Sequence, residues 1–130
     1  MIRVVLDASA LLAVLNAEPG ADIVRASLPG AVISSVNYSE VLKKAIERGG
    51  TGDAGAAFVR GLSVAIIPFD PALAQASAEL YPQCKEFGLS LADRACLALG
   101  IQRDATVFTA DSKWKELGLS VKLKLIRNAH

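Results

Sequence analysis

The chain has 130 residues, a length that suits one domain with a buried core and no need of disulfides or structural metal. Its formal net charge of +1 excludes a general electrostatic attraction to nucleic acid, so binding of a polyanion must depend on local clusters or on bound metal. Cys84 and Cys96 form no metal-binding or disulfide pattern, and the one histidine is His130, so zinc-ligand motifs and disulfide frameworks are excluded.

Short β-branched apolar runs alternate along the chain with longer segments of helical pattern. The predicted strands span residues 3–6, 31–33, 64–67, 105–108 and 121–126. The predicted helices span residues 9–17, 22–28, 36–48, 53–62, 71–81, 91–102 and 112–117. This alternation predicts one α/β domain over residues 1–130, with three α/β/α layers around a parallel sheet of four to five strands. In the last run apolar and basic residues alternate, which predicts an edge strand.

Four carboxylates occupy positions that such a fold brings together. Asp7 directly follows the first predicted strand, and Asp111 lies just past the fourth. Open α/β sheets bind ligands beyond the carboxyl ends of their strands, so these two aspartates face each other if the two strands are neighbours. Glu40 and Asp93 fall in the early turns of the third and sixth predicted helices, from which both side chains can lean over the same crevice.

A cluster of carboxylates has a chemical consequence. Close carboxylates repel one another and take up protons unless a divalent cation compensates their charge. An all-oxygen ligand set favours Mg²⁺ or Mn²⁺ over zinc, and these ions activate water for attack on a phosphodiester. Mechanisms that pair serine or cysteine with histidine lack their base in this sequence.

Each acid taken alone also has a structural explanation, as a helix cap or an ion-pair partner. These assignments are Asp7 or Ser9 as the cap of the first helix, Asp111 as the cap of the short last helix, Asp93 in a capping box with Ser90, and Glu40 paired with Lys43 or Lys44. The structural explanation is favoured for any single position. Convergence at one edge of the sheet shifts the balance toward a shared site.

Several motifs, in order and spacing, resemble the PIN-domain family, and specifically the VapC toxins of bacterial and archaeal toxin–antitoxin pairs. They are VLDASALL at residues 5–12, EPG at 18–20, SVNYSEV at 35–41, LSLADRACLA at 89–98 and VFTADSKW at 107–114. The resemblance implies a sheet of order 3-2-1-4-5 and a ribonuclease dependent on Mg²⁺ or Mn²⁺. It also implies a homodimer that is neutralised by a VapB-type antitoxin.

The resemblance also assigns site residues. Asp7, Glu40, Asp93 and Asp111 match the family's catalytic, metal-binding acidic quartet. Ser9 and Thr109 match the hydroxyl positions that orient ligands or water, and Asn37 is a plausible polar neighbour.

Partners and location follow from apolar patterning. Residues 10–15 are apolar on nearly all sides, which leaves two interpretations: contact with another chain, or complete burial within the domain. The hydrophobic fraction of 52% favours a partner chain. Asp7 interrupts the only apolar N-terminal run, and no run approaches the roughly 20 residues of a membrane span, so we expect a soluble, cytoplasmic protein with no membrane contact.

Two other functions remain open. Leu6-Asp7-Ala8-Ser9 resembles the haloacid-dehalogenase phosphatases, but that metal-dependent family has a second aspartate where Ser9 stands, so a phosphatase is disfavoured. A catalytically inert interaction module is the other alternative, and the intact acidic quartet argues against it. Two basic residues, Arg94 and Lys113, are candidates to contact RNA phosphates, although scattered basic residues are most often solvated surface.

Overall fold

The computed structural model describes residues 3–127, so His130 lies outside the described part of the chain. The strands are β1 (Val4–Leu6), β2 (Ala31–Ser34), β3 (Ala65–Ile67), β4 (Thr106–Thr109) and β5 (Lys122–Leu125). They form one five-stranded sheet in which every neighbouring pair is parallel, in the order β3-β2-β1-β4-β5. This order and the edge position of the last strand are as predicted. Since β1 lies between β2 and β4 and all three are parallel, their carboxyl ends meet at one edge of the sheet.

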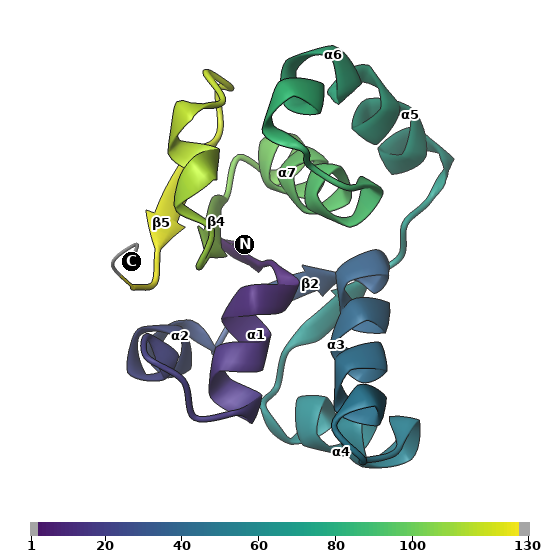
Figure 1. The fold of residues 1–130 in the computed structure, drawn as a ribbon, viewed down its shortest axis with the longest axis vertical. Helices are drawn as coiled ribbons and strands as arrows, with labels where there is room; N and C mark the ends of the chain where they lie inside the picture. The colour runs from purple at the N-terminus through teal and green to yellow at the C-terminus, as the bar shows by residue number, and fades with distance from the viewer. Residues whose placement is uncertain (1–2, 128–130) are drawn as a thin grey trace.

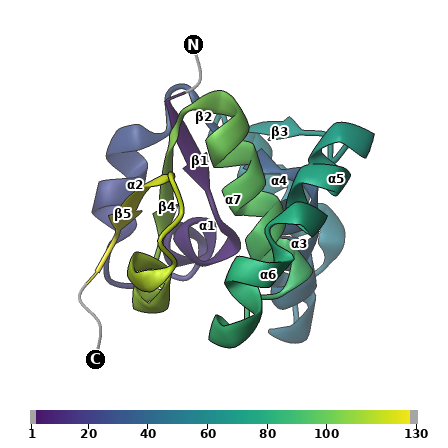
Figure 2. The same cartoon turned by 90° about the horizontal axis from the view of Figure 1, so that it is seen from above.

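Helices cover both faces of the sheet, which confirms the predicted three layers (Figure 1). The α-helices are α1 (Ala8–Leu15), α2 (Ala21–Ser27), α3 (Ser35–Glu47), α4 (Gly52–Gly61), α5 (Pro71–Glu79), α6 (Tyr81–Cys84) and α7 (Leu91–Arg103). Two 3₁₀-helices follow α6 and β4 respectively, namely η1 (Lys85–Phe87) and η2 (Ser112–Glu116). Figures 1 and 2 show α1 and α2 on one face of the sheet and α5, α6 and α7 on the other. No helix within residues 3–127 is long and apolar enough to cross a bilayer.

Alternating side chains of the central strands divide the interior into two cores. Leu6 and Ile33 belong to the core shared with α1 to α4, and Val5 and Val107 belong to the core shared with α5 and α7. All four side chains are fully buried. Burial on both faces explains why the inner strands read as continuous apolar runs rather than as alternating ones.

Two predicted helices differ from the structure. The helix predicted over residues 71–81 ends at Glu79, and a separate turn, α6, begins at Tyr81. Pro82 causes this break, because its ring has no N–H to donate and clashes with the carbonyl oxygen of a preceding helical turn. The segment predicted as a helix over residues 112–117 is the 3₁₀-helix η2, in which the backbone N–H of Trp114 donates to Asp111 and that of Leu117 to Trp114, three residues back in each case.

The apolar segment at residues 10–15 lies in α1, whose side chains are almost wholly buried within this one chain. Val24 of α2, Val41 of α3 and Ile126, just after β5, belong to the same core cluster. The structure therefore decides between the two interpretations of this helix in favour of burial inside the domain. Its composition gives no argument for a partner chain.

Helix α7 lies close against β4 at Gly100. A Cβ atom at this position would overlap Cγ2 of Val107 and would lie 3.5 Å from Cγ2 of Val121 and 3.8 Å from the carbonyl oxygen of Ala105. Val107 is fully buried and its branched side chain has little rotational freedom. The absence of a side chain at residue 100 therefore sets the distance between α7 and the sheet.

We expect Gly100→Ala to lower the free energy of unfolding by about 1–3 kcal/mol, because the added methyl group overpacks a closed core. Gly61→Ala is the matched control, since a Cβ there meets nothing within 4 Å and Gly61 also lies in a helix. The control should be neutral or more stable by up to about 1 kcal/mol. Urea unfolding of both variants measures the difference, and equal stabilities would contradict the packing argument.

Candidate active site

The Asp7 carboxylate lies at the end of β1 and forms the N-cap of α1. Its Oδ1 accepts hydrogen bonds from the backbone N–H of Ala10 at 2.8 Å and from the Ser9 hydroxyl at 2.7 Å. Its Oδ2 accepts a hydrogen bond from the Thr109 hydroxyl at 2.5 Å. Asp7 is only 5% exposed, so these donors replace most of the water that a free carboxylate would bind.

The same two hydroxyls connect Asp7 to the end of β4. The Ser9 hydroxyl oxygen accepts from the backbone N–H of Ala110 at 2.9 Å, and that of Thr109 accepts from the N–H of Asp111 at 3.0 Å. Asp111 also caps η2, since its Oδ1 accepts a hydrogen bond from the backbone N–H of Lys113 at 3.0 Å. Asp7 and Asp111 are thus held near each other by the strand pairing and by these side-chain bonds.

Asp93 and Glu40 come from the first turn of α7 and the second turn of α3. Asp93 forms the expected capping box, since its Oδ2 accepts from the backbone N–H of Ser90 at 2.9 Å and its own N–H donates to the Ser90 hydroxyl at 3.2 Å. The buried Asn37 donates from Nδ2 to the carbonyl oxygen of Ala92 at 3.0 Å. This bond joins the helix that carries Glu40 to the turn that carries Asp93.

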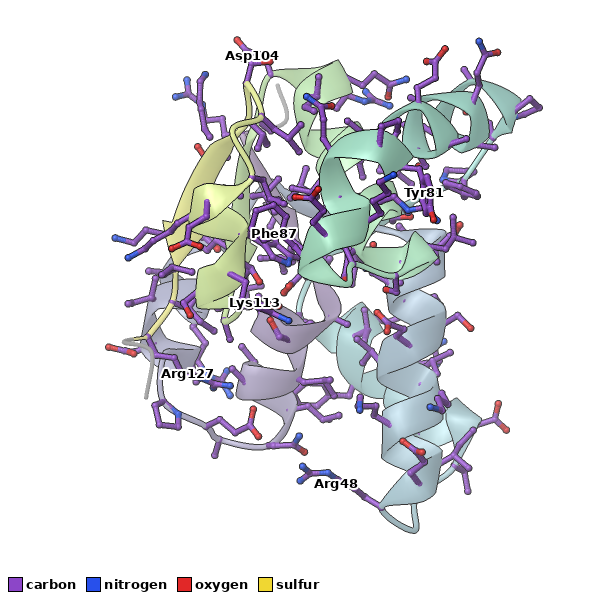
Figure 3. All side chains as sticks on the ribbon, turned by 45° about the horizontal axis from the view of Figure 1, so that its top comes forward. Arg48, Tyr81, Phe87, Asp104, Lys113 and Arg127 are labelled. Atoms are coloured by element: carbon purple, nitrogen blue, oxygen red, sulfur yellow. The ribbon has the colours of Figure 1, made fainter. Side chains whose placement is uncertain are left out.

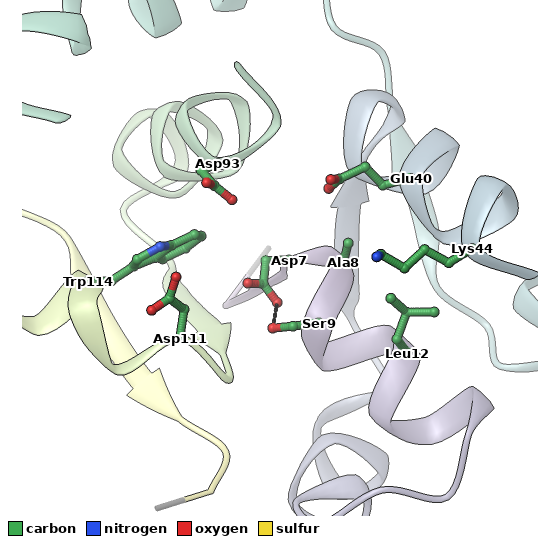
Figure 4. A pocket seen from close by; sticks show the side chains of 9 residues that line it. All are labelled: Asp7, Ala8, Ser9, Leu12, Glu40, Lys44, Asp93, Asp111 and Trp114. Atoms are coloured by element: carbon green, nitrogen blue, oxygen red, sulfur yellow. Dashed lines mark hydrogen bonds between the residues drawn. The ribbon is translucent and has the colours of Figure 1, made fainter. Parts of the chain in front are cut away.

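The four predicted acids line one cavity of about 180 Å³ (Figure 4). The lining residues are Asp7, Ala8, Ser9, Leu12, Glu40, Lys44, Asp93, Asp111 and Trp114. The cavity opens at the carboxyl ends of β1 and β4, the edge at which the sheet order predicts a ligand site. Asp7, Asp93 and Asp111 therefore each make a helix-capping bond and also line the shared cavity. The structural and the functional explanations of these residues are compatible.

Burial and mutual repulsion change the acidity of this cluster. Burial raises the pKa of Asp7 from its ordinary value of 3.8 to about 6, against the opposing effect of its hydrogen bonds, and the charge of Asp93 adds to the rise. Burial also raises the pKa of Glu40, again with a contribution from Asp93. The cavity therefore gathers negative charge at some energetic cost, which a cation would relieve.

The carboxylates do not form a closed metal cage. Within residues 3–127, no group of three or more His, Cys, Asp or Glu side chains is arranged to hold a metal ion. Over the same residues, Oδ1 of Asp93 and Oδ2 of Asp111 accept no hydrogen bond from the protein. Mg²⁺ in phosphotransfer sites commonly takes only one or two carboxylates and completes its shell with water and substrate phosphate. The chemistry of these donors fits such an ion.

Comparison with known protein families decides the family. The PIN domain profile matches residues 4–119, which is most of the chain. The chain belongs to the PIN-domain family. Comparison with curated proteins found no match.

Solved structures share the whole PIN fold of this chain. A toxin–antitoxin complex from Klebsiella pneumoniae matches with a TM-score of 0.75 at 19% identity, covering 97% of this chain and 99% of the other. DNA-bound VapBC from Salmonella typhimurium matches with a TM-score of 0.75 at 15% identity, covering 98% and 100%. VapC20 of Mycobacterium tuberculosis, a toxin that cleaves the sarcin–ricin loop, matches with a TM-score of 0.75 at 20% identity, covering 92% and 98%. The TM-scores show that these chains share one fold with this protein.

Basic residues of the PIN domain lie differently from the prediction. Arg94 is half-buried, donates from Nη1 to the carbonyl oxygen of Ser77 at 3.1 Å and stacks 5.4 Å from the ring centre of Tyr81. Lys113 is exposed on η2, as labelled in Figure 3, and it is not among the residues that line the cavity. The basic residue that does line it is Lys44, which the sequence analysis considered only as an ion-pair partner. Lys44 follows Glu40 by four residues, which places both on one helix face. The sequence therefore already indicated that Lys44 lies near the site.

The aromatic wall of the cavity is Trp114, the only tryptophan of the chain. It is 1% exposed and belongs to the core on the side of α7. Trp114 is thus both a core residue and a wall of the acidic cavity. Its fluorescence is therefore a local probe of what enters the cavity.

We expect Asp7→Asn to raise the free energy of unfolding in EDTA at pH 7.5, by about 3 kcal/mol at most. Because the pKa of Asp7 is higher in the folded state, its protonation stabilises the fold below about pH 4, and this contribution is lost as the pH rises through about 6. The gain in the variant should shrink toward zero near pH 4. Denaturant unfolding between pH 4 and 8 measures it, and Glu116→Gln, an exposed site, should show no such trend.

Proposed function

We propose that this PIN domain is a VapC-type toxin, an endoribonuclease that hydrolyses RNA phosphodiesters with Mg²⁺ or Mn²⁺. The observation that carries the proposal is the gathering of Asp7, Glu40, Asp93 and Asp111 around one cavity at the carboxyl edge of the sheet. Such a cavity offers oxygen ligands and no protein nucleophile paired with a histidine, which suits hydrolysis by water.

The four acids would hold the metal, and they differ in how firmly the protein fixes each carboxylate. Asp7 is the rigid centre, because three hydrogen bonds fix its carboxylate. Ser9 and Thr109, both proposed as cofactor-binding residues, direct their hydroxyls at Asp7 and act on the metal through it. When bound, Mg²⁺ or Mn²⁺ activates water and stabilises negative charge on the phosphodiester. Asp93 and Asp111 each offer the carboxylate oxygen that the backbone does not use.

Structures of similar fold support the biological part of the proposal. The Klebsiella structure is a toxin–antitoxin complex, the Salmonella structure is DNA-bound VapBC, and VapC20 is described as a toxin that cleaves the sarcin–ricin loop. We propose the same kind of partner here, a small VapB-type antitoxin that neutralises the nuclease. We also propose a homodimer, for which the exposed apolar side chains of Tyr81, Leu91 and Ile101 on α6 and α7 offer a contact surface.

We expect the purified protein to cleave total cellular RNA only when Mg²⁺ or Mn²⁺ is added, and excess EDTA to stop cleavage. Asp7→Asn and Asp93→Asn should each reduce the rate by at least about 100-fold, because each removes charge from the metal site. Asp53→Asn, an exposed change on α4, is the control and should leave the rate unchanged. Circular dichroism verifies that the variants are folded.

Cleavage that persists in EDTA would contradict the metal mechanism. If the wild-type protein cleaves no RNA although Mn²⁺ changes its Trp114 fluorescence, the inert interaction module is favoured. Mapping the ends of the products identifies the cleaved site.

Expression of the wild-type chain should arrest bacterial growth, and Asp111→Asn should relieve the arrest because it weakens metal binding. Glu116→Gln, also on η2 but exposed, is the control that should remain toxic. Co-expression of the small protein encoded next to the nuclease gene should restore growth. Equal toxicity of the Asp111 variant and the control at equal protein levels would indicate a different activity.

A further inference from the structure

Of the residues that the structure describes, 3–127, Lys44 is the only basic one that lines the acidic cavity. It lies on α3 one turn after Glu40, and Figure 4 shows its ammonium group reaching toward the first turn of α1, beside Ala8. The residue is exposed, so it occupies the mouth of the cavity rather than its floor. A ligand bound at this part of the mouth therefore lies close to a positive charge.

The ammonium group of Lys44 is not committed to an ion pair. Among residues 3–127 no carboxylate oxygen lies within 4.0 Å of its Nζ, whereas the adjacent Lys43 pairs with Glu47 at 3.5 Å. The pairing with Glu40 considered from the sequence is thus absent for both lysines. Both lysines nevertheless lie near enough to Glu40 for their charges to oppose the rise in the pKa of that carboxyl, and of the two only Lys44 lines the cavity.

The net charge of the cavity determines which ligands can bind near Lys44. Four carboxylates face one ammonium group there, so the cavity strongly attracts a dication but repels a phosphodiester anion. A metal ion bound by the acids offsets part of that repulsion. Among the residues within 3–127 that line the cavity, Lys44 carries the single positive charge, whereas Arg94 is engaged with Ser77 and Tyr81.

We propose that Lys44 binds a backbone phosphate of the RNA at the mouth of the cavity and so places the scissile bond over the acidic cluster. A lysine is a hydrated point charge on a flexible stem, which suits a phosphate whose exact position changes during entry. The proposal rests on the ribonuclease function proposed above. It makes Lys44 a substrate-binding residue that is not a metal ligand.

The first experiment measures RNA binding with the adjacent lysine as a matched control. Lys44→Gln and Lys43→Gln are each made in the inactive Asp7→Asn background, and a short fluorescein-labelled RNA spanning a mapped cleavage site is titrated at several KCl concentrations and constant Mg²⁺. We expect Lys44→Gln to raise Kd on the order of fivefold and to lower the slope of log Kd against log salt by about 0.7, the loss of one phosphate contact. Lys43→Gln should change neither quantity.

The second experiment separates substrate binding from metal binding. In the active enzyme Lys44→Gln should raise KM for the same RNA on the order of fivefold with kcat changed less than twofold, and Lys44→Arg should restore KM. Mn²⁺ titration monitored by Trp114 fluorescence should show equal or tighter metal binding in Lys44→Gln, since a repelling positive charge is gone. Circular dichroism and thermal unfolding show that each variant is folded.

The outcomes distinguish the proposals. A salt slope and KM in Lys44→Gln equal to those of Lys43→Gln would overturn the role of Lys44 while leaving the ribonuclease intact. Weaker Mn²⁺ binding with a lowered kcat would overturn it too, because Lys44 would then act by arranging the acids. Failure of the wild-type protein to cleave RNA overturns the proposed function, and the role of Lys44 falls with it.

Discussion

The buried carboxylate of Asp7 is the constraint on which the site depends. A charged group with 5% exposure is unfavourable unless donors replace its water, and here Ser9, Ala10 and Thr109 supply them from two adjacent strand ends. Because the same hydroxyls also accept backbone N–H groups from residues 110 and 111, the network fixes the start of α1 relative to the end of β4. The residual desolvation shows in the raised pKa of Asp7. The fold therefore holds an unfavourable charge at the carboxyl edge of the sheet.

Helix capping places the other aspartates of the cluster. Asp93 and Asp111 each accept a backbone N–H at the first turn of a helix, and a helix N-terminus stabilises negative charge. The capping bond uses one carboxylate oxygen. Because it fixes the side chain, it also fixes the direction of the second oxygen. Stability and site geometry are thus obtained from one interaction. This explains why a capping pattern in the sequence and an acidic cluster in space describe the same residues.

The sequence predicts those parts of the structure that follow from local chemistry and from the parallel sheet. β-branched runs indicated the strands, and Asp7 and Asp111 could be placed at one sheet edge because parallel strands end together. The sequence left open what covers α1, since an apolar helix packs equally well on its own domain or on a partner. The turn α6 was missed because Pro82 interrupts a continuous helical pattern. Lys44 was read as an ion-pair partner because spacing indicates proximity but does not show whether a pair forms.

The cavity combines fixed and adjustable charges, and this combination suits a metal that keeps part of its water shell. Asp7 is held by the sheet, whereas Glu40 is half-buried on α3 and Lys44 is exposed one turn further along the same helix. Asn37 ties that helix to α7 through one buried hydrogen bond, which restrains the distance between the backbones that carry Glu40 and Asp93. A fully convergent set of four carboxylates would repel more strongly before a cation arrives. The open arrangement over residues 3–127 limits that repulsion in the free protein, and a bound ion would still have positions for water and phosphate.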